Sequence, residues 1–202
     1  MDNDNFFTEE YFREIYAVFY RTNMWAIEKL AQQIYNIKRQ KGRLFIVGNG
    51  GSLATASHAV NDFRKIVGIE AYNPGDNCAE LTARTNDDGF DTVFSEWLKT
   101  SQLNDNDAIL VLSVGGGNKE LGVSLNIVKA IDYAMQVGCT VLGIVGKDGG
   151  YTAENADSCV IIPTVNNDRI TPHVESWHSI ILHLLVSHPL LKENQTKWES
   201  MN

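Results

Sequence analysis

Two pairs of side chains that can exchange protons are spaced so that each pair shares one face of a predicted helix. His58 and Asp62 are four residues apart, and Glu175 and His183 are eight apart. These spacings bring the second residue to within about 40° and about 80° of the first around a helix. If the pairs converge, two carboxylates and two imidazoles can remove a proton beside a carbonyl group and protonate its oxygen. The same four groups can instead hold a zinc ion that polarises these oxygens.

Two glycine-rich turns follow apolar runs, and both can bind an anion. The stretch FIVGNGGSLATASH contains the turn at Gly48–Ser52, and SVGGGN contains the turn at Gly115–Gly117. Glycine lets backbone N–H groups approach an anion closely, the following helix start adds partial positive charge, and Ser52 would add a hydroxyl donor. The first turn lacks the third glycine of the dinucleotide motif, and no G-K-[ST] sequence is present. We therefore expect a phosphate-bearing ligand but no nucleotide; alternatively, the glycines only let the chain turn.

The elements that must position these residues alternate between strands and helices after residue 42. The apolar runs RLFIVG, AILVLSVGGG, TVLGIVGKDGG and SCVIIP predict strands that are buried on both faces. SLATASHAVNDFRKIV and ELGVSLNIVKAIDYAMQVG predict the helices after the first two strands, and a last helix is expected from Thr171 to Ser187. This order is typical of a three-layer, doubly wound α/β domain with a parallel sheet, in which ligands bind beyond the carboxyl ends of the strands.

The N-terminal part of the chain predicts two consecutive helices between Thr8 and Gln40, with a break near residues 21–23. This part is unusually aromatic, which suits either the core or a subunit interface. We expect a single domain over residues 1–202. It would comprise an N-terminal helical extension for oligomerisation (1–41), an α/β core (42–190) and a tail (191–202).

Composition excludes several functional classes. The 202 residues carry a net charge of −8, so binding to a nucleic-acid backbone is not expected. No apolar run approaches the roughly 18 residues that span a bilayer, and MDNDNFFTEE lacks the pattern of a signal peptide. The three cysteines show no C-x-x-C spacing, which favours free thiols over a disulfide framework or a cysteine zinc site. A cytoplasmic protein is expected.

The motifs resemble those of the sugar-isomerase (SIS) domain. GNGGS after a strand, followed by a histidine six residues past the serine, is similar to this family, and within it to the phosphoheptose isomerases. TNDDGFDTVFSEWL, GIVGKDGG, ADSCVIIPT and DRI follow in the family's order, so the resemblance extends from the N-terminal helices to about His188. It implies a flavodoxin-like SIS fold and an isomerase of sedoheptulose 7-phosphate and D-glycero-D-manno-heptose 7-phosphate.

The resemblance also implies roles for the two residue pairs. Phosphoheptose isomerases carry a His and a Glu on the helix after GNGGS, and a Gln and a His on the final helix. These four residues bind zinc in some members, and the Glu and the final His act as base and acid. His58, Asp62, Glu175 and His183 occupy these positions, so Asp replaces Glu and Glu replaces Gln. The resemblance therefore implies a zinc site of these four residues, with His183 as the acid and either Asp62 or Glu175 as the base.

The remaining candidate residues would bind the substrate. The family's second glycine turn is rich in serine and threonine, whereas this chain has only Ser113 there, with Asn118 as a possible substitute. The resemblance places Asp87 and Asp168 beside the substrate; Asp87 could also lie in a solvated loop, and Asp168 could cap the last helix. His178 matches a histidine of the family's final helix, although a packed or interface role suits it equally. The full substrate-binding set is Asn49, Gly50, Gly51, Ser52, Asp87, Ser113, Gly115, Gly116, Gly117, Asn118 and Asp168.

The favoured function is thus an aldose–ketose isomerase acting on a phosphorylated sugar. The resemblance implies a homotetramer with active sites between subunits and a role in supplying heptose for surface polysaccharide or lipopolysaccharide. Two alternatives stay open: an isomerase of another phosphosugar, and a non-catalytic SIS module that binds a sugar phosphate or a protein partner as a regulator.

Overall fold

The computed structural model describes residues 6–201, and it contains one five-stranded sheet in the order β2-β1-β3-β4-β5. All neighbouring strands are parallel, and Phe45 lies opposite Ile109 at the centre. The strands are β1 (Leu44–Gly48), β2 (Ala71–Tyr72), β3 (Ala108–Ser113), β4 (Thr140–Val145) and β5 (Ser158–Ile161). The doubly wound parallel sheet predicted from the apolar runs is confirmed. The edge strand β2 was not predicted, because two residues are too few to form a recognisable run.

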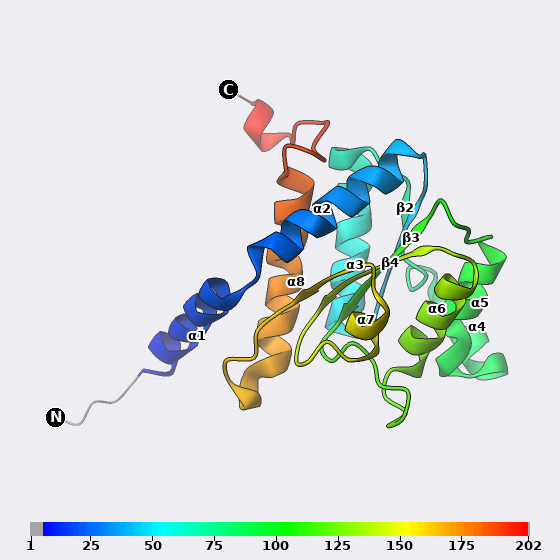
Figure 1. Ribbon diagram of the computed structural model, residues 1–202, viewed down its shortest axis with the longest axis horizontal. Coiled ribbons are helices and arrows are strands. Elements are labelled where there is room, and N and C mark those ends of the chain that lie inside the picture. The colour runs from blue at the N-terminus through cyan, green and yellow to red at the C-terminus, as the bar shows by residue number, and fades with distance from the viewer. Residues whose placement is uncertain (1–5, 202) are drawn as a thin grey trace.

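Helices cover both faces of the sheet (Figure 1). Alternate residues of β1 point to opposite sides: Leu44 and Ile46 pack with α2, α3 and α8, whereas Phe45 and Val47 pack with α5 and α6. The helices are α1 (Phe7–Arg21), α2 (Met24–Arg39), α3 (Gly51–Asp62), α4 (Cys78–Asp88), α5 (Val93–Thr100), α6 (Leu125–Gln136), α7 (Gly150–Asn155) and α8 (Ile170–Ser187). Shorter helical turns are η1 (Phe63–Val67), η2 (Phe90–Thr92), η3 (Asn167–Arg169) and η4 (Trp198–Ser200).

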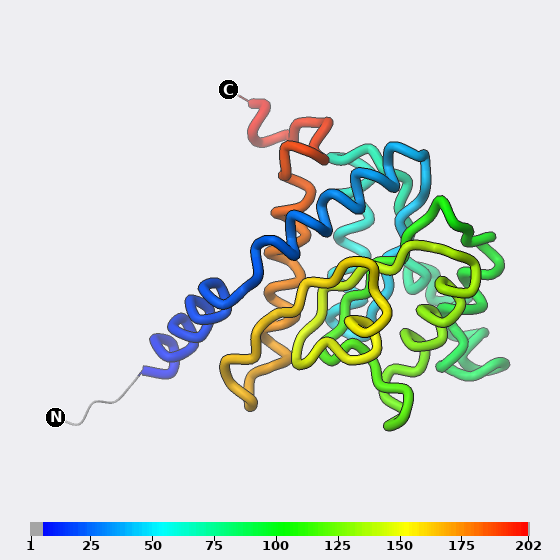
Figure 2. The backbone as a smooth tube through the Cα atoms, viewed as in Figure 1, coloured from blue at the N-terminus to red at the C-terminus, as the bar shows by residue number. Residues whose placement is uncertain are grey.

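The two N-terminal helices, α1 and α2, differ in how closely they pack against the rest of the chain. Five residues of α2 are buried, whereas Val18 is the only residue of α1 that is buried. The chain bends between them at Thr22 and Asn23, as the sequence predicted, and α1 extends away from the sheet (Figure 2). Most of the aromatic side chains of α1 are therefore left exposed.

The segment before α6 departs from the prediction of a helix beginning near Glu120. Residues 118–123 instead form a small turn closed by an antiparallel bridge between Asn118 and Val123. The Oδ1 atom of Asn118 accepts a hydrogen bond from the Leu121 amide at 2.7 Å, and Gly122 and Ser124 have positive φ angles. These left-handed residues interrupt the helical pattern, so α6 begins only at Leu125.

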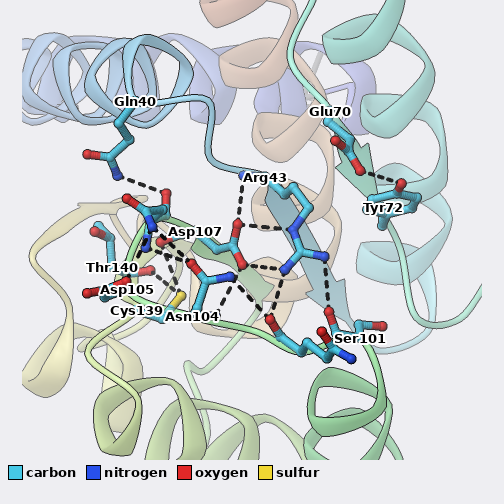
Figure 3. A network of polar contacts seen from close by, with 12 residues as sticks. Gln40, Arg43, Glu70, Tyr72, Ser101, Asn104, Asp105, Asp107, Cys139 and Thr140 are labelled. Atoms are coloured by element: carbon cyan, nitrogen blue, oxygen red, sulfur yellow. Dashed lines mark hydrogen bonds and ion pairs between the residues drawn. The ribbon is translucent and has the colours of Figure 1, made fainter.

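A buried ion pair fixes the amino-terminal end of the sheet (Figure 3). The Arg43 guanidinium, just before β1, donates to both carboxylate oxygens of Asp107, just before β3, at 3.1 and 2.6 Å. Asp107 also accepts from the backbone amides of Arg43 and Asn104, at 2.9 and 3.2 Å. The Asp107 side chain is only 2% exposed, so removal of the carboxylate would leave these donors without an acceptor.

We expect Asp107→Ala to lower the free energy of unfolding by about 3 kcal/mol, because it leaves the largely buried Arg43 charge unpaired. Urea unfolding followed by circular dichroism measures the change. Glu96→Ala, which breaks the exposed Lys99–Glu96 pair, is the matched control and should cost less than about 0.5 kcal/mol. Equal losses in the two variants would contradict the role assigned to Asp107.

Candidate functional site

A cavity lies at the carboxyl ends of β1 and β3. These neighbouring strands are followed by α3 and α6, which pack on opposite faces of the sheet, so the chain forms a topological switch point here. The cavity has a volume of about 550 Å³. It is lined by Asn49, Gly50, Leu53, Leu81, Phe90, Asp91, Phe94, Gly122, Ser124, Leu125 and Asn126. Asn49 and Gly50 were predicted to bind substrate, and they lie here.

Three polar residues that line the cavity were not predicted from the sequence as site residues. Ser124 and Asn126 begin α6, and Asp91 lies on η2. Ser124 holds a left-handed backbone with φ 52°, which is unusual for a residue other than glycine. The letters SLN before an apolar helix are a capping pattern that could have revealed the first two. Asp91 pairs with Lys129 on α6, a contact between distant segments that sequence spacing does not show.

His58, Asp62 and His183 form a cluster where α3 meets α8. The Oδ2 atom of Asp62 lies 3.1 Å from the Nε2 atom of His58 and 3.8 Å from that of His183, and the two Nε2 atoms are 3.5 Å apart. Asp62 is 15% exposed as a side chain, whereas both imidazoles are more than half exposed. Two imidazole nitrogens and one carboxylate oxygen that converge within 4.8 Å match the donors that zinc prefers.

Glu175 does not join this cluster, which corrects the expectation that all four residues converge within one chain. Its carboxylate lies against Gly51 at the start of α3, where a Cβ atom on Gly51 would meet Oε2 at 2.5 Å. Eight residues bring Glu175 and His183 to one face of α8, but they also separate the two along the helix axis by about 12 Å. Of the four residues, the single chain therefore assembles only His58, Asp62 and His183.

The cavity and the His–Asp cluster lie on opposite sides of α3. Leu53 lines the cavity, whereas His58 and Asp62 follow it by five and nine residues, about 140° and about 180° around the helix. α3 therefore stands between the cavity and the three proton-exchanging side chains of its own chain.

Ser52 is placed in the interior rather than on the cavity wall. Its Oγ lies 3.5 Å from the Nδ1 atom of His178 on α8, and its side chain faces away from the cavity lining. Desolvation lowers the pKa of His178 to about 4, a shift that the Ile144 carbonyl only partly opposes. The neutral ring packs fully buried against the first turn of α3, so His178 has the packed role rather than an exposed one.

The second glycine turn is tied to neighbouring backbone. The amide of Gly116 donates to Ser113 Oγ at 3.1 Å, and its carbonyl accepts from the amide and hydroxyl of Thr152 at 3.0 and 2.7 Å. A Cβ on Gly116 would clash with the Gly149 carbonyl, so the turn needs glycine to pack on α7. Gly115, Gly117, Ser113 and Asn118 are absent from the lining of the cavity, and Asn118 borders a different one beside α7.

The two predicted aspartates are both exposed, away from the cavity lining. Asp87 lies in the last turn of α4, where it accepts from the Asn86 side chain at 2.8 Å. Asp168 does not cap α8, contrary to one expectation, because Asn166 accepts from the Asp168 amide and so caps the η3 turn. The residue before α8 is Arg169, and no side chain caps the start of that helix.

A partly buried acid on α1, Glu14, holds the Asp168 turn in place. The Glu14 carboxylate accepts from Arg169 at 2.7 and 2.9 Å and from Asn166 at 2.6 Å, and it lies 2.7 Å from His173 Nε2. The Arg169 hydrogen bond is the main reason that the pKa of Glu14 falls to about 2. Through these contacts α1 is anchored to the segment that leads into α8.

Comparison with known proteins relates this architecture to sugar isomerases. A family model described as the SIS domain matches residues 9–146. A phosphoheptose isomerase of Trichlorobacter lovleyi is 34% identical over 164 residues, which are 79% of this chain and 78% of that protein. One from Rhodospirillum rubrum is 33% identical over 165 residues, covering 79% and 82%. The solved phosphoheptose isomerase of Neisseria gonorrhoeae superposes with a TM-score of 0.77 at 22% identity, covering 89% of this chain and 95% of that one, and shares the fold.

The buried His178 should make stability fall in mild acid. Because its folded pKa is about 4 and the unfolded pKa is about 6.5, the unfolded chain binds the extra proton between these values. The free energy of unfolding should therefore drop by about 2 kcal/mol from pH 7 to pH 5. Urea titrations at the two pH values measure it, with His178→Leu as the control that should lack this drop. Equal pH dependence in both proteins would show that His178 is not held neutral by burial.

Proposed function

The chain belongs to the SIS-domain family and, within it, to the phosphoheptose isomerases, and on this premise we propose that it interconverts sedoheptulose 7-phosphate and D-glycero-D-manno-heptose 7-phosphate. The observation that carries the proposal is the convergence of His58, Asp62 and His183. An aldose–ketose isomerisation needs one group to remove a proton from the carbon beside the carbonyl and another to protonate the oxygen. A carboxylate within 4 Å of two imidazoles supplies both.

The geometry favours Asp62 over Glu175 as the base. The Asp62 carboxylate lies beside His183, the proposed acid, whereas Glu175 lies against Gly51 at the other end of the α3–α8 contact. In this proposal Asp62 takes the proton from the carbon beside the carbonyl while His183 protonates the carbonyl oxygen, which gives the enediol. Asp62 then returns the proton to the former carbonyl carbon, and His183 takes the proton of the other hydroxyl, so both groups regain their starting states. His58 contacts both residues and keeps the carboxylate oriented.

The same three residues fit a divalent metal. The Nε2 atoms of His58 and His183 face each other at 3.5 Å, and both approach one carboxylate oxygen, an arrangement that suits shared coordination. We propose that His58, Asp62 and His183 hold zinc, which when bound polarises the carbonyl and hydroxyl oxygens of the substrate. Glu175 would become a fourth ligand only if assembly or ligand binding brought it to the cluster.

The cavity at the switch point is the proposed place for the phosphorylated sugar. Ser124, which directly precedes α6, and Leu125 and Asn126, its first two residues, line the cavity, so the positive end of that helix would face the ligand. None of the described residues that line the cavity is a lysine or an arginine. We place the phosphate at Ser124 and the sugar chain toward Asn49.

We propose that a second copy of the chain completes the active site, a proposal supported by the position of α3 between the cavity and the His–Asp cluster. The exposed aromatic residues of α1 offer a surface for that contact; Phe12 and Tyr16 are 65% and 66% exposed. We propose a homotetramer assembled through α1, with active sites between subunits. No helix within residues 6–201 has the length and apolar character needed to cross a bilayer. We further propose a cytoplasmic location and a role in heptose supply for surface polysaccharide or lipopolysaccharide.

The activity is tested by following sedoheptulose 7-phosphate by NMR with added zinc and, in parallel, with EDTA. We expect manno-heptose 7-phosphate to appear with zinc and not with EDTA. Asp62→Asn and His183→Gln should each lower kcat by at least about 100-fold, since each removes a proton-transfer group. Glu175→Gln should reduce kcat far less.

Other outcomes of this experiment would contradict parts of the proposal. Turnover unaffected by EDTA would exclude the metal, and a larger loss in Glu175→Gln than in Asp62→Asn would make Glu175 the base. If the wild-type protein bound the sugar phosphate without turning it over, the chain would be a non-catalytic SIS module.

Assembly is tested with the double variant Phe12→Glu/Tyr16→Glu. Charges at these exposed positions should oppose packing of two α1 helices, so light scattering should show smaller particles and turnover should fall in parallel. Trp198→Glu is the matched control, because Trp198 is an exposed aromatic residue outside α1. Full turnover by a monomeric variant would show that one copy holds a complete site.

A further inference from the structure

A pair of asparagine side chains bridges the two loops that border the cavity. Asn49 follows β1, and Asn126 lies in the first turn of α6 after β3. The Nδ2 atom of Asn49 donates to the Oδ1 atom of Asn126 at 3.1 Å, and Nδ2 of Asn126 donates back to Oδ1 of Asn49 at 2.7 Å. The two amides thus form a closed, reciprocal pair across the switch point, and both residues line the cavity.

Apolar packing alone does not explain why a buried asparagine occupies position 126. The residue is 1% exposed, and a buried amide costs free energy unless its polar atoms are bonded. Its oxygen accepts from Asn49 and from the Ile127 amide at 3.0 Å, so the burial is compensated only while Asn49 stays in place. The pair therefore fixes the orientation of both amides and the spacing of the two loops.

Each amide keeps one unused donor. An Asn Nδ2 atom carries two hydrogens, and for Asn49 and Asn126 only one of them has an acceptor among the described residues. Asp91 is the only charged residue in the cavity wall, and its carboxylate pairs with Lys129. The free N–H groups are therefore neutral donors in a cavity that is largely apolar.

We propose that Asn49 and Asn126 act as one unit that binds the hydroxyl and carbonyl oxygens of the sugar chain, with Asn126 as the residue that positions Asn49. Neutral amide donors suit uncharged sugar oxygens, whereas the phosphate is better placed at Ser124 and the positive end of α6. The inference rests on the proposed function in taking a phosphorylated ketose as the ligand. The inference goes beyond that function in two ways. It names the sugar oxygens as the part of the substrate that the two asparagines recognise, and it gives Asn126 a positioning role.

The kinetic test is a double-mutant cycle with Asn49→Ala, Asn126→Ala and the double variant, assayed with sedoheptulose 7-phosphate. Each single variant should lower kcat/KM by about 10-fold, and the double variant should lose little more, because either change breaks the same unit. Asn126→Asp should fail to restore activity, since its second oxygen would face Oδ1 of Asn49. Asn36→Asp, on the exposed side of α2, is the matched control and should behave as wild type.

A purely structural role of Asn126 predicts another pattern. In that case Asn126→Ala would lower the melting temperature while kcat/KM of the folded protein stayed at the wild-type value. That result, or losses that multiply in the double variant, would overturn the inference.

Side-chain amide NMR tests the pair without any turnover. The Asn49→Ala variant should show Nδ2 signals of Asn126 that are shifted from their wild-type positions, as the contact between the two amides requires. Sedoheptulose 7-phosphate should shift the same signals, whereas inorganic phosphate should not. Equal shifts with inorganic phosphate, or none with the sugar phosphate, would overturn the inference even if the wild type were active. An inactive wild type would refute the proposed function, and the amide shifts would still decide the role of the pair.

Discussion

The neighbouring positions of β1 and β3 are the constraint on which the rest of the structure depends. Both strands are fully buried, so each must be covered on two faces, and the helices that follow them pack on opposite sides. The loops after the strands then diverge and leave the cavity between them. The Arg43–Asp107 ion pair joins the two strands at one end, and the Asn49–Asn126 amide pair joins them at the other.

Helix α3 divides the chemistry of the chain between its two sides. One side faces the cavity through Leu53, and the other side carries His58 and Asp62 toward α8. In the proposed function, the sugar-binding cavity and the proton-transfer residues of one chain therefore lie on opposite sides of this helix. The proposed assembly through α1 would cover the aromatic side chains that this helix leaves exposed.

Helix α8 connects the remaining parts. Glu175 and His178 lie one turn apart and contact Gly51 and Ser52 at the start of α3, and His183 meets the far end of the same helix. The amino-terminal end of α8 is anchored to α1 through Arg169, His173 and Glu14.

By itself, the sequence determined the parallel α/β fold, the break between α1 and α2, and the pairing of His58 with Asp62. These features depend on local spacing: buried runs define strands, and residues four apart on a helix are neighbours. Only the tertiary structure decided that Glu175 lies outside the His–Asp cluster and that Ser52 lies in the interior. It alone also showed that Ser124, Asn126 and Asp91 line the cavity. Spacing gives an angle around one helix, but it does not give the position of that helix relative to another. That position is set by how the side chains of α3, α6 and α8 pack against the sheet, and these contacts join residues far apart in the chain.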